Sequence, residues 1–401
     1  MRVCMLAYSF YDSDNRVMRY AETLAARGDA VEVISLRYEG QAKQEVIEGV
    51  TVRRIQRRKK NERSAWSHLQ RVLAFACRAT WLLTLGHLRR PYDLIHVHSM
   101  PDFLVFAAWW PRLTGCRIIL DIHDLLPEFY RAKFKISEKS ATNRLLLVEE
   151  RLSADIAHHV IVPNHLWQER VARRLDRANE CTVIINAPDR SLFQPRVRKR
   201  IDNKIVLLYP GSLNQHQGLD IAIRAVASAR NRVPELEFHI YGSGPEQSFL
   251  EKLIIELGLE SVVFLRPARP IREIAAIMAE ADLGVVPKRS DSFGDEAFST
   301  KILEFMASGV PVVVSETKVD RHYFNDTLVM FFPSGDVDRL AAAIVELAES
   351  PELRNRFVTN GLEFVRSCDW ESNKAEYLTL VDTLTGRLPA SQAPVCHTNL
   401  S

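Results

Sequence analysis

Residues 291–315 read DSFGDEAFSTKILEFMASGVPVVVS and join a polar loop, a short helix and an apolar strand. The spacing predicts the helix, because positions i, i+3, i+4 and i+7 of one buried face are occupied by Ile302, Phe305, Met306 and Gly309. The apolar run at 310–314 predicts the strand. A helix that leads directly into a buried strand is the repeating unit of a parallel α/β sheet.

The same alternation extends along the whole chain. After a basic, proline-containing linker at 189–203, we predict strands at 204–209, 237–241, 262–265, 283–286 and 310–314, separated by helices at 219–229, 248–257, 271–280 and 301–308. Before the linker we predict a helix at 16–26 and strands at 2–8, 30–36, 50–54, 94–98, 117–122 and 160–163. Strands that alternate with crossover helices form parallel sheets, so the sequence predicts two doubly wound, Rossmann-like domains in series.

Length and composition agree with two ordinary globular domains. The chain has 401 residues, of which 47% are hydrophobic and 26% charged, with a net charge of +3. We predict an N-terminal domain at 1–188 and a C-terminal domain at 189–369. The tail at 388–401 has no periodicity and is expected to be disordered. No apolar run approaches the roughly 18 residues of a membrane span, and Met1–Ala7 is too short for a signal peptide.

The six cysteines are scattered and form no CxxC pair. We therefore expect reduced thiols in a cytoplasmic protein and no zinc site. No other cluster of Asp, His or Cys reads as a metal site, so no metal cofactor is expected. Gly242 and Gly244 form a GxG turn after a strand, but the third glycine of a dinucleotide fingerprint is replaced by Gln247, which disfavours a dehydrogenase.

The start of the helix at 301–308 has the features of an anion site. Free backbone N–H groups and the positive end of the helix dipole lie near Ser299 and Thr300, and Lys301 adds a cation. Glu304, one turn further on, is placed to accept hydrogen bonds from ribose hydroxyls, and Glu296 lies in the preceding loop, within reach of a sugar. The alternative is that Lys301 and Glu304 form a surface pair and Glu296 is a solvated acid.

These residues resemble a known family. The run from Glu296 through Glu304 to Val312 looks like the donor-site signature of family 4 retaining glycosyltransferases, which have the GT-B fold of two Rossmann-like domains facing a central cleft. Segments 209–220, 238–246 and 263–287 are also similar to the family's donor domain. The resemblance implies that Glu304 holds the ribose and Glu296 the transferred sugar, and that a final helix at 370–387 crosses back to the N-terminal domain.

The diphosphate site departs from the family pattern. The resemblance places Gly211, Ser212 and Gly242 against the donor, but the family's usual Arg and Lys are replaced here by Ser212 and Gln217. We expect Lys301 and the helix N-terminus to neutralise the phosphates, with Lys288 as a second cation.

In the N-terminal half, Asp121-Ile122-His123-Asp124 ends a strand and enters a loop. The family carries a histidine at the place of His123, near the transferred sugar, which implies a catalytic role; a structural role is the alternative. Asp124 is predicted to bind the acceptor. Asp14 and Arg16, after the first strand, are also acceptor candidates, although Asp14 is equally suited to cap the next helix.

Residues 53–90 form a basic block with interleaved aromatic residues. Eleven Arg or Lys lie between residues 50 and 95, with only Glu62 and Asp93 to balance them. This composition suits an anionic membrane surface, while the alternative is a solvated loop and ordinary core aromatics. We expect a peripheral position on the inner face of the plasma membrane and no nucleic-acid binding.

The predicted function is transfer of a sugar, with retention of configuration, from a nucleotide-sugar donor to a glycan or lipid-linked acceptor. Retention is implied by the resemblance alone, as is a bacterial surface-polysaccharide or glycolipid pathway. Two alternatives share the architecture: a nucleotide-sugar 2-epimerase, and a non-catalytic scaffold subunit, which the missing basic pair would favour.

Overall fold

The computed structural model describes residues 1–58, 65–177, 180–196, 202–368 and 370–387. The described residues form two compact units, one made of Met1–Ile185 with residues 373–387, the other of Asn186–Ser372. The sequence places the domain limits at 188/189 and 369/370, and these limits remain predictions. The tail predicted at 388–401 lies outside the described residues, as do Lys59, Lys60 and Arg63 of the basic block.

The described part of the N-terminal unit has an eight-stranded sheet in the order β3-β4-β2-β1-β5-β6-β7-β8. Its strands are β1 (Arg2–Phe10), β2 (Ala30–Arg37), β3 (Gln44–Ile47), β4 (Val50–Arg57), β5 (Leu94–His98), β6 (Arg117–Asp121), β7 (His159–Val162) and β8 (Cys181–Val183). Only the β3–β4 pair among them is antiparallel. Because β1 lies between β2 and β5, the strand order reverses there, and ligands bind at the carboxyl ends of strands beside such a reversal.

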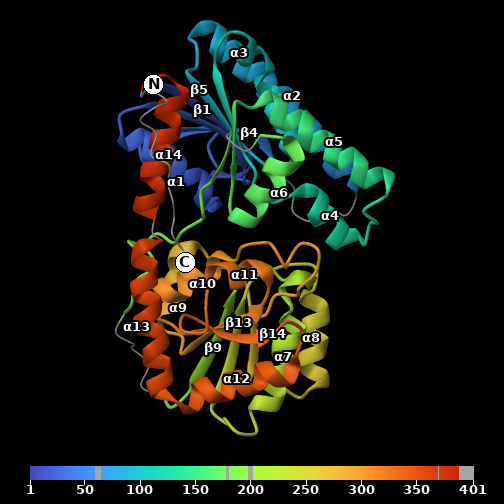
Figure 1. Cartoon of the computed structure of the whole chain (residues 1–401), viewed down its shortest axis with the longest axis vertical. Coiled ribbons are helices and arrows are strands. Elements are labelled where there is room, and N and C mark those ends of the chain that lie inside the picture. Colours follow the sequence, from blue (N-terminus) through green and yellow to red (C-terminus); the bar gives the residue numbers. More distant parts are fainter. Residues whose placement is uncertain (59–64, 178–179, 197–201, 369, 388–401) are drawn as a thin grey trace. The chain divides into compact units, whose positions relative to one another are not determined.

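Helices cover both faces of this sheet (Figure 1). They are α1 (Asn15–Ala26), α2 (Ala65–Arg89), α3 (Trp109–Leu113), α4 (Leu126–Phe134), α5 (Ala141–Ile156), α6 (His165–Leu175) and α14 (Trp370–Leu384), with short 3-10 turns η1 (Tyr11–Ser13) and η2 (Asp102–Ala108). Helix α14 lies beside α1, where the rings of Tyr20 and Tyr377 are 4.3 Å apart and Arg27 pairs with Asp382 at 2.8 Å. The final helix therefore packs on the N-terminal unit.

The C-terminal unit has a six-stranded parallel sheet in its described residues, in the order β11-β10-β9-β12-β13-β14. The strands are β9 (Ile205–Pro210), β10 (Leu236–Tyr241), β11 (Val263–Arg266), β12 (Leu283–Val286), β13 (Val312–Glu316) and β14 (Met330–Pro333). The helices are α7 (Leu219–Ala229), α8 (Gln247–Glu256), α9 (Ile271–Ala279), α10 (Thr300–Ala307), α11 (Lys318–Tyr323), α12 (Val337–Glu349) and α13 (Pro351–Ser367), with the turn η4 (Gln215–Gln217).

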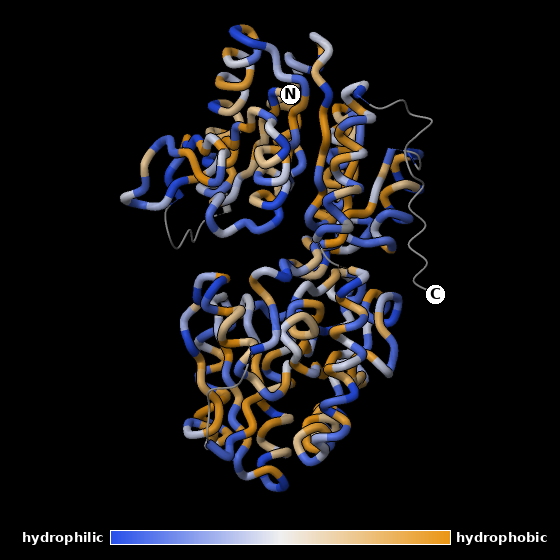
Figure 2. The backbone as a smooth tube through the Cα atoms, turned by 90° about the vertical axis from the view of Figure 1, so that its left-hand side faces the viewer, coloured by the Kyte–Doolittle hydropathy of each residue, from blue (hydrophilic) through white to orange (hydrophobic). Residues whose placement is uncertain are grey.

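Burial of apolar side chains holds each unit together. Strands β5 and β12 are buried along their whole length, as expected for parallel strands covered on both faces. Hydrophobic and hydrophilic residues alternate along the helices (Figure 2), which is the pattern of helices that bury one face. Phe238 of β10 is fully buried, and burial of such a side chain contributes about 1.5–3 kcal/mol. No helix among the described residues has the length and apolar character needed to cross a bilayer.

Candidate functional site

In the C-terminal unit, the predicted anion site lies at the first turn of α10. Ser299 is the N-cap residue, but its side chain makes no capping hydrogen bond. It is only 7% exposed, and its Oγ has no hydrogen-bond partner among the described residues. A buried hydroxyl without a partner is energetically unfavourable unless a ligand satisfies it. The unused hydroxyl and the free N–H groups of the first turn, where Thr300 lies, therefore suit an anion.

Two loops at the carboxyl ends of β9 and β10 pack directly on each other. The backbone N–H of Gly211 donates to Tyr241 O at 2.8 Å, and Leu213 N–H donates to Ser243 O at 3.0 Å. A Cβ atom at Gly242 would collide with the carbonyl oxygen of Gly211. The GxG turn is thus explained by loop packing, which brings Gly211 and Gly242 together, and their predicted contact with the donor stays a prediction.

Lys301 extends from α10 to this loop pair. A Cβ atom at Gly211 would collide with its Cε, and its Nζ lies 5.4 Å from the ring centroid of Tyr209. Burial lowers the pKa of Lys301, although the charge of Glu304 opposes that change. A partly desolvated ammonium next to a backbone loop is suited to pair with a phosphate.

The positions that depart from the family pattern surround the same lysine. Ser212 is exposed, whereas Gln217 is half-buried and its Oε1 accepts a hydrogen bond of 2.9 Å from Tyr209 Oη. Glu296 and Glu304 are both half-buried, Glu296 in the loop before α10 and Glu304 one turn into the helix. The arrangement gathers the predicted donor residues at the carboxyl ends of the central strands.

Lys288, the predicted second cation of the donor site, is buried in an ion pair. Its Nζ lies 2.9 Å from Asp320 Oδ2 and donates to Ala297 O at 2.8 Å, and both charged side chains are buried. These contacts hold the loop before α10 against α11. Because the ammonium is already paired, the structure gives Lys288 a scaffolding role, and its predicted role as a second phosphate cation stays a prediction.

In the N-terminal unit, a buried carboxylate gathers four hydrogen-bond donors at the end of β6. Asp121 is completely buried, and Arg16 contacts both of its oxygens at 2.7 Å, through Nε to Oδ2 and through Nη2 to Oδ1. Nδ1 of His98 and Nε2 of His123 each lie 3.1 Å from Oδ2. Burial alone would raise the pKa of Asp121, but Arg16 and His123 lower it well below its usual range.

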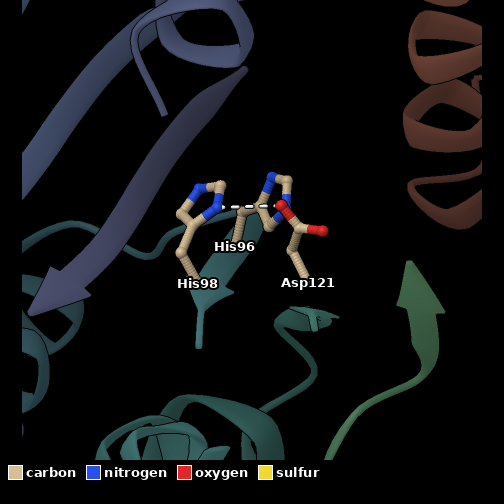
Figure 3. Close-up of side chains that lie close together, drawn as sticks. All are labelled: His96, His98 and Asp121. Atoms are coloured by element: carbon tan, nitrogen blue, oxygen red, sulfur yellow. Dashed lines mark hydrogen bonds and ion pairs between the residues drawn. The ribbon is translucent and has the colours of Figure 1, made fainter. Parts of the chain in front are cut away.

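Figure 3 shows His98 and His96, both from β5, next to the Asp121 carboxylate. The ligand atoms of these three residues lie within 4.8 Å of one another, which is a donor set of the kind that binds metals. The Arg16 guanidinium, however, already contacts both carboxylate oxygens and neutralises their charge. A divalent cation would be placed against this guanidinium, so the cluster fits a hydrogen-bond network better than a metal site.

The remaining N-terminal candidates differ in burial and in their contacts. Arg16 is only 7% exposed and its third donor binds Ile184 O at 2.8 Å, so its contacts are internal and the predicted acceptor contact stays a prediction. Asp14 caps α1 by accepting from Val17 N–H at 3.3 Å, as the capping alternative expected. His123 and Asp124 are half-buried, and burial raises the pKa of Asp124 to about 6.

Two family descriptions cover the chain, one for each unit. Residues 13–187 match the glycosyl transferase 4-like domain, and residues 192–364 match the glycosyl transferases group 1. The phosphatidyl-myo-inositol mannosyltransferase of Mycobacterium leprae is 30% identical over 306 residues, which is 73% of this chain and 74% of that protein. This chain belongs to the group 1 glycosyltransferases.

Other relatives agree with this assignment. The alpha-D-kanosaminyltransferase of Streptomyces kanamyceticus is 29% identical over 282 residues, 66% of the glycosyltransferase described here and 70% of that relative. Among solved structures, sucrose-phosphate synthase from Thermosynechococcus elongatus has a TM-score of 0.79 at 18% identity, covering 97% of this chain and 100% of its own. HepE from Anabaena, solved with UDP and glucose, has a TM-score of 0.72 at 17% identity, covering 96% and 100%.

The glycosyltransferase therefore has the GT-B fold of two Rossmann-like units, and the resemblance read from residues 296–312 is confirmed. Its class is also confirmed as an enzyme that transfers sugars, and the epimerase and scaffold alternatives are not favoured. Sequence reasoning did not identify Asp121 as the centre of a network. The available signal was its position at the end of a predicted strand, two residues before His123.

Proposed function

We propose that this glycosyltransferase moves a hexosyl residue from a nucleotide diphosphate sugar to a glycan or lipid-linked acceptor, with retention of configuration. The main support is the placement of Lys301, whose ammonium lies against the Gly211 loop at the first turn of α10. The named mannosyltransferase and kanosaminyltransferase relatives support a hexosyl group, and the relative named for phosphatidyl-myo-inositol supports a lipid-linked acceptor.

In the proposed reaction the bond between the sugar and the diphosphate breaks as the acceptor oxygen attacks. The N–H groups of the first turn of α10, the Ser299 hydroxyl and Lys301 stabilise the charge that develops on the departing diphosphate. Glu304 accepts hydrogen bonds from the ribose, and Glu296 from the hydroxyls of the transferred sugar. The departing phosphate takes the acceptor proton, so the mechanism uses no separate base.

We also propose that the reaction proceeds without a metal. The proposed donor site already supplies a cation and helix N–H groups to the diphosphate, and Asp121 is neutralised by Arg16. Transfer should therefore be unchanged after dialysis against EDTA. Loss of transfer in EDTA and its recovery with Mg²⁺ or Mn²⁺ would disprove this part of the proposal.

The experiment that tests the function is calorimetric binding of UDP-, GDP-, ADP- and dTDP-sugars to the full chain. One donor should bind with saturation, and Lys301→Ala and Glu304→Ala should each weaken it about tenfold or more, since a hydrogen bond to a charged group contributes about 1.5–3 kcal/mol. Lys252→Ala and Glu256→Ala, both exposed on α8, are the matched controls. Equal weakening by the control variants, or no binding of any donor, would count against the proposed site.

We further propose that the N-terminal unit contacts the inner face of the plasma membrane. The β4 end of the basic block does not take part, because Arg53 pairs with Glu32 and the buried Arg54 pairs with Asp12 and Glu45. The support comes from exposed apolar residues on neighbouring helices. This apolar helical face consists of Leu73, Trp81 and Leu88 of α2, Trp109 and Leu113 of α3, and Leu145, Val148 and Leu152 of α5.

Cations accompany this apolar helical face. Helix α2 carries no acidic residue, and Arg78 and Arg89 are exposed on it, while Arg144 and Arg151 are exposed on α5. Exposed apolar side chains between arginines suit anionic lipid.

Vesicles with phosphatidylglycerol should bind the protein and neutral phosphatidylcholine vesicles should not. Trp81→Ser should weaken binding, whereas Ile255→Ser, an exposed apolar residue of the other unit, should leave it unchanged; equal effects would count against this face.

A further inference from the structure

Arg16 fixes the Asp121 carboxylate in a single orientation. The guanidinium makes two parallel contacts of 2.7 Å with the carboxylate. Its third nitrogen, Nη1, donates to Ile184 O at 2.8 Å. A fork of this kind restricts rotation as well as adding attraction. The net stability gained from a buried pair is small, because desolvation offsets the attraction. The main consequence of the pair is therefore geometric.

Asp121 in turn orients His123. Nε2 of His123 lies 3.1 Å from Asp121 Oδ2, and the backbone N–H of His123 donates to Ser99 Oγ at 3.1 Å. A carboxylate acceptor places the proton on Nε2, which leaves Nδ1 as the ring nitrogen available to a ligand. The His123 side chain is 21% exposed, whereas the Asp121 side chain is 0% exposed. Among these residues, His123 alone is open to a substrate.

We propose that Arg16 and Asp121 are positioning residues of the sugar transfer, which hold His123 in one ring orientation with Nδ1 directed at the substrate. The inference rests on the proposed function and on the family resemblance, which implies that His123 lies near the transferred sugar. Asp121 acts through His123 and touches no substrate, because it is completely buried. Arg16 acts one step further away, by keeping Asp121 ionised and fixed.

The charges around His123 favour its protonated form. Burial opposes protonation, but the charge and hydrogen bond of Asp121 outweigh it, and the pKa of His123 is raised. Asp14 acts in the same direction, whereas Arg16 opposes it. The other neighbours are Asp124, which follows in the chain, and His98, whose Nδ1 lies 3.3 Å from Nε2 of His123 and whose pKa is lowered by burial. Protonated His123 donates from Nδ1 to a sugar hydroxyl or phosphate oxygen.

The first test reads His123 directly, without a donor. In the full chain, the ring-proton NMR signal of His123 is assigned by its absence in His123→Gln and titrated with pH. Asp121→Asn should lower the measured pKa of His123 by about 1 or more, because an opposite charge at this distance has an effect of that size. Glu32→Gln, which removes a different ion-pair carboxylate of the same sheet, should leave the titration unchanged. An unchanged titration in folded Asp121→Asn would overturn the proposal.

The second test is a double-mutant cycle on turnover with the donor identified by calorimetry. Asp121→Asn should lower kcat about tenfold to hundredfold with little change in the KM of the donor. In the His123→Gln background it should have no further effect, because its action passes through His123. Full additivity of the two effects would overturn the proposal.

A replacement variant and one further outcome separate the test of the positioning role from the test of the proposed function. If Asp121→Asn does not fold, Arg16→Lys replaces it, since it keeps the positive charge and loses the two-pronged contact; the same direction of change is expected. If the His123 titration moves as predicted but no donor supports transfer, the positioning stands and the proposed function fails.

Discussion

In the proposed donor site, Lys301 takes the place of the cations that two other positions lack. The family pattern places basic residues where this chain has Ser212 and Gln217, yet the Lys301 ammonium lies next to the same loop from a different element. Tyr209 links the two regions, because its hydroxyl lies 2.9 Å from Gln217 Oε1 and its ring lies under Lys301. One side chain from α10 can thus act where the family uses two from the β9 loop.

This substitution can be tested by restoring the family residue. Lys301→Ala should weaken donor binding about tenfold or more, and adding Gln217→Lys should recover a large part of the loss, since it places an ammonium next to the same loop. Calorimetry with the best donor measures both changes. Gln217→Met, of similar length and without charge, should give no recovery; recovery with Met would mean that charge at this site is unimportant.

Individual residues also show which parts of the candidate site the sequence could predict. Ser299, Lys301 and Glu304 were identified because helix spacing and the helix start place them within one turn of each other. Asp121 was missed as a network centre because its partner Arg16 is 105 positions away in the chain. A single sequence does not show which residues so far apart in the chain come into contact in the fold. The sequence also gave no indication that Lys288 is buried and pairs with Asp320.

At the scale of elements, the strands that were not predicted, β3, β8 and β14, all lie at sheet edges. Strand β5 was predicted at 94–98 and α7 at 219–229, and both have these bounds in the structure. Strand β3 was missed because it is mostly exposed and lacks a strong apolar pattern, and its turn to β4 uses Glu48 with a positive φ of 48° rather than an Asn-Gly pair. Apolar periodicity therefore identifies core strands better than edge strands.

Helix α14 is joined to the N-terminal sheet by a buried polar contact. The hydroxyl of Tyr377 lies 3.0 Å from Nδ1 of His96, and both side chains are completely buried. Tyr377→Phe would leave this ring nitrogen unpaired, at a cost of about 1–3 kcal/mol. The unfolding midpoint of the N-terminal unit should fall by several degrees in calorimetry. Tyr38→Phe, at a partly exposed tyrosine, should change it little, and an equal fall in both would contradict a specific role for this contact.

At the scale of the whole molecule, the two units respond differently to pH. Among the described residues, carboxyls with a raised pKa all lie in the N-terminal unit: Asp102, Asp124, Glu149, Glu150 and Glu376. Burial is the largest cause for each of them. In the C-terminal unit, the carboxyls with a shifted pKa are Glu237 and Asp295, and hydrogen bonds and nearby cations outweigh burial there and lower it. Apart from Asp121, whose pKa Arg16 and His123 lower, the shifted carboxyls of the two units therefore have pKa values displaced in opposite directions.

The sign of the pH effect follows from proton binding. A carboxyl with a raised pKa keeps its proton in the folded unit while the unfolded chain has lost it, so stability falls as pH rises toward the folded pKa. Burial raises the pKa of Glu150 to about 7 and raises that of Asp102 well above its usual range. Below about pH 6.5, His96 and His98 oppose this trend, because burial lowers their pKa and the unfolded chain binds the protons. The window for measurement is therefore pH 6.5 to 8.5.

In this window, calorimetry should show one unfolding transition that moves with pH and one that does not. The N-terminal transition should move to lower temperature as the pH rises, since a carboxyl that keeps its proton in the folded unit loses stability relative to the unfolded chain with rising pH. Asp102→Asn should raise that transition at pH 8 and flatten its slope, because the amide needs no proton to remain buried. Asp155→Asn, at an exposed aspartate of the same unit, should do neither. Equal slopes for both transitions, or an unchanged slope in Asp102→Asn, would show that the buried acids of the N-terminal unit do not control its stability.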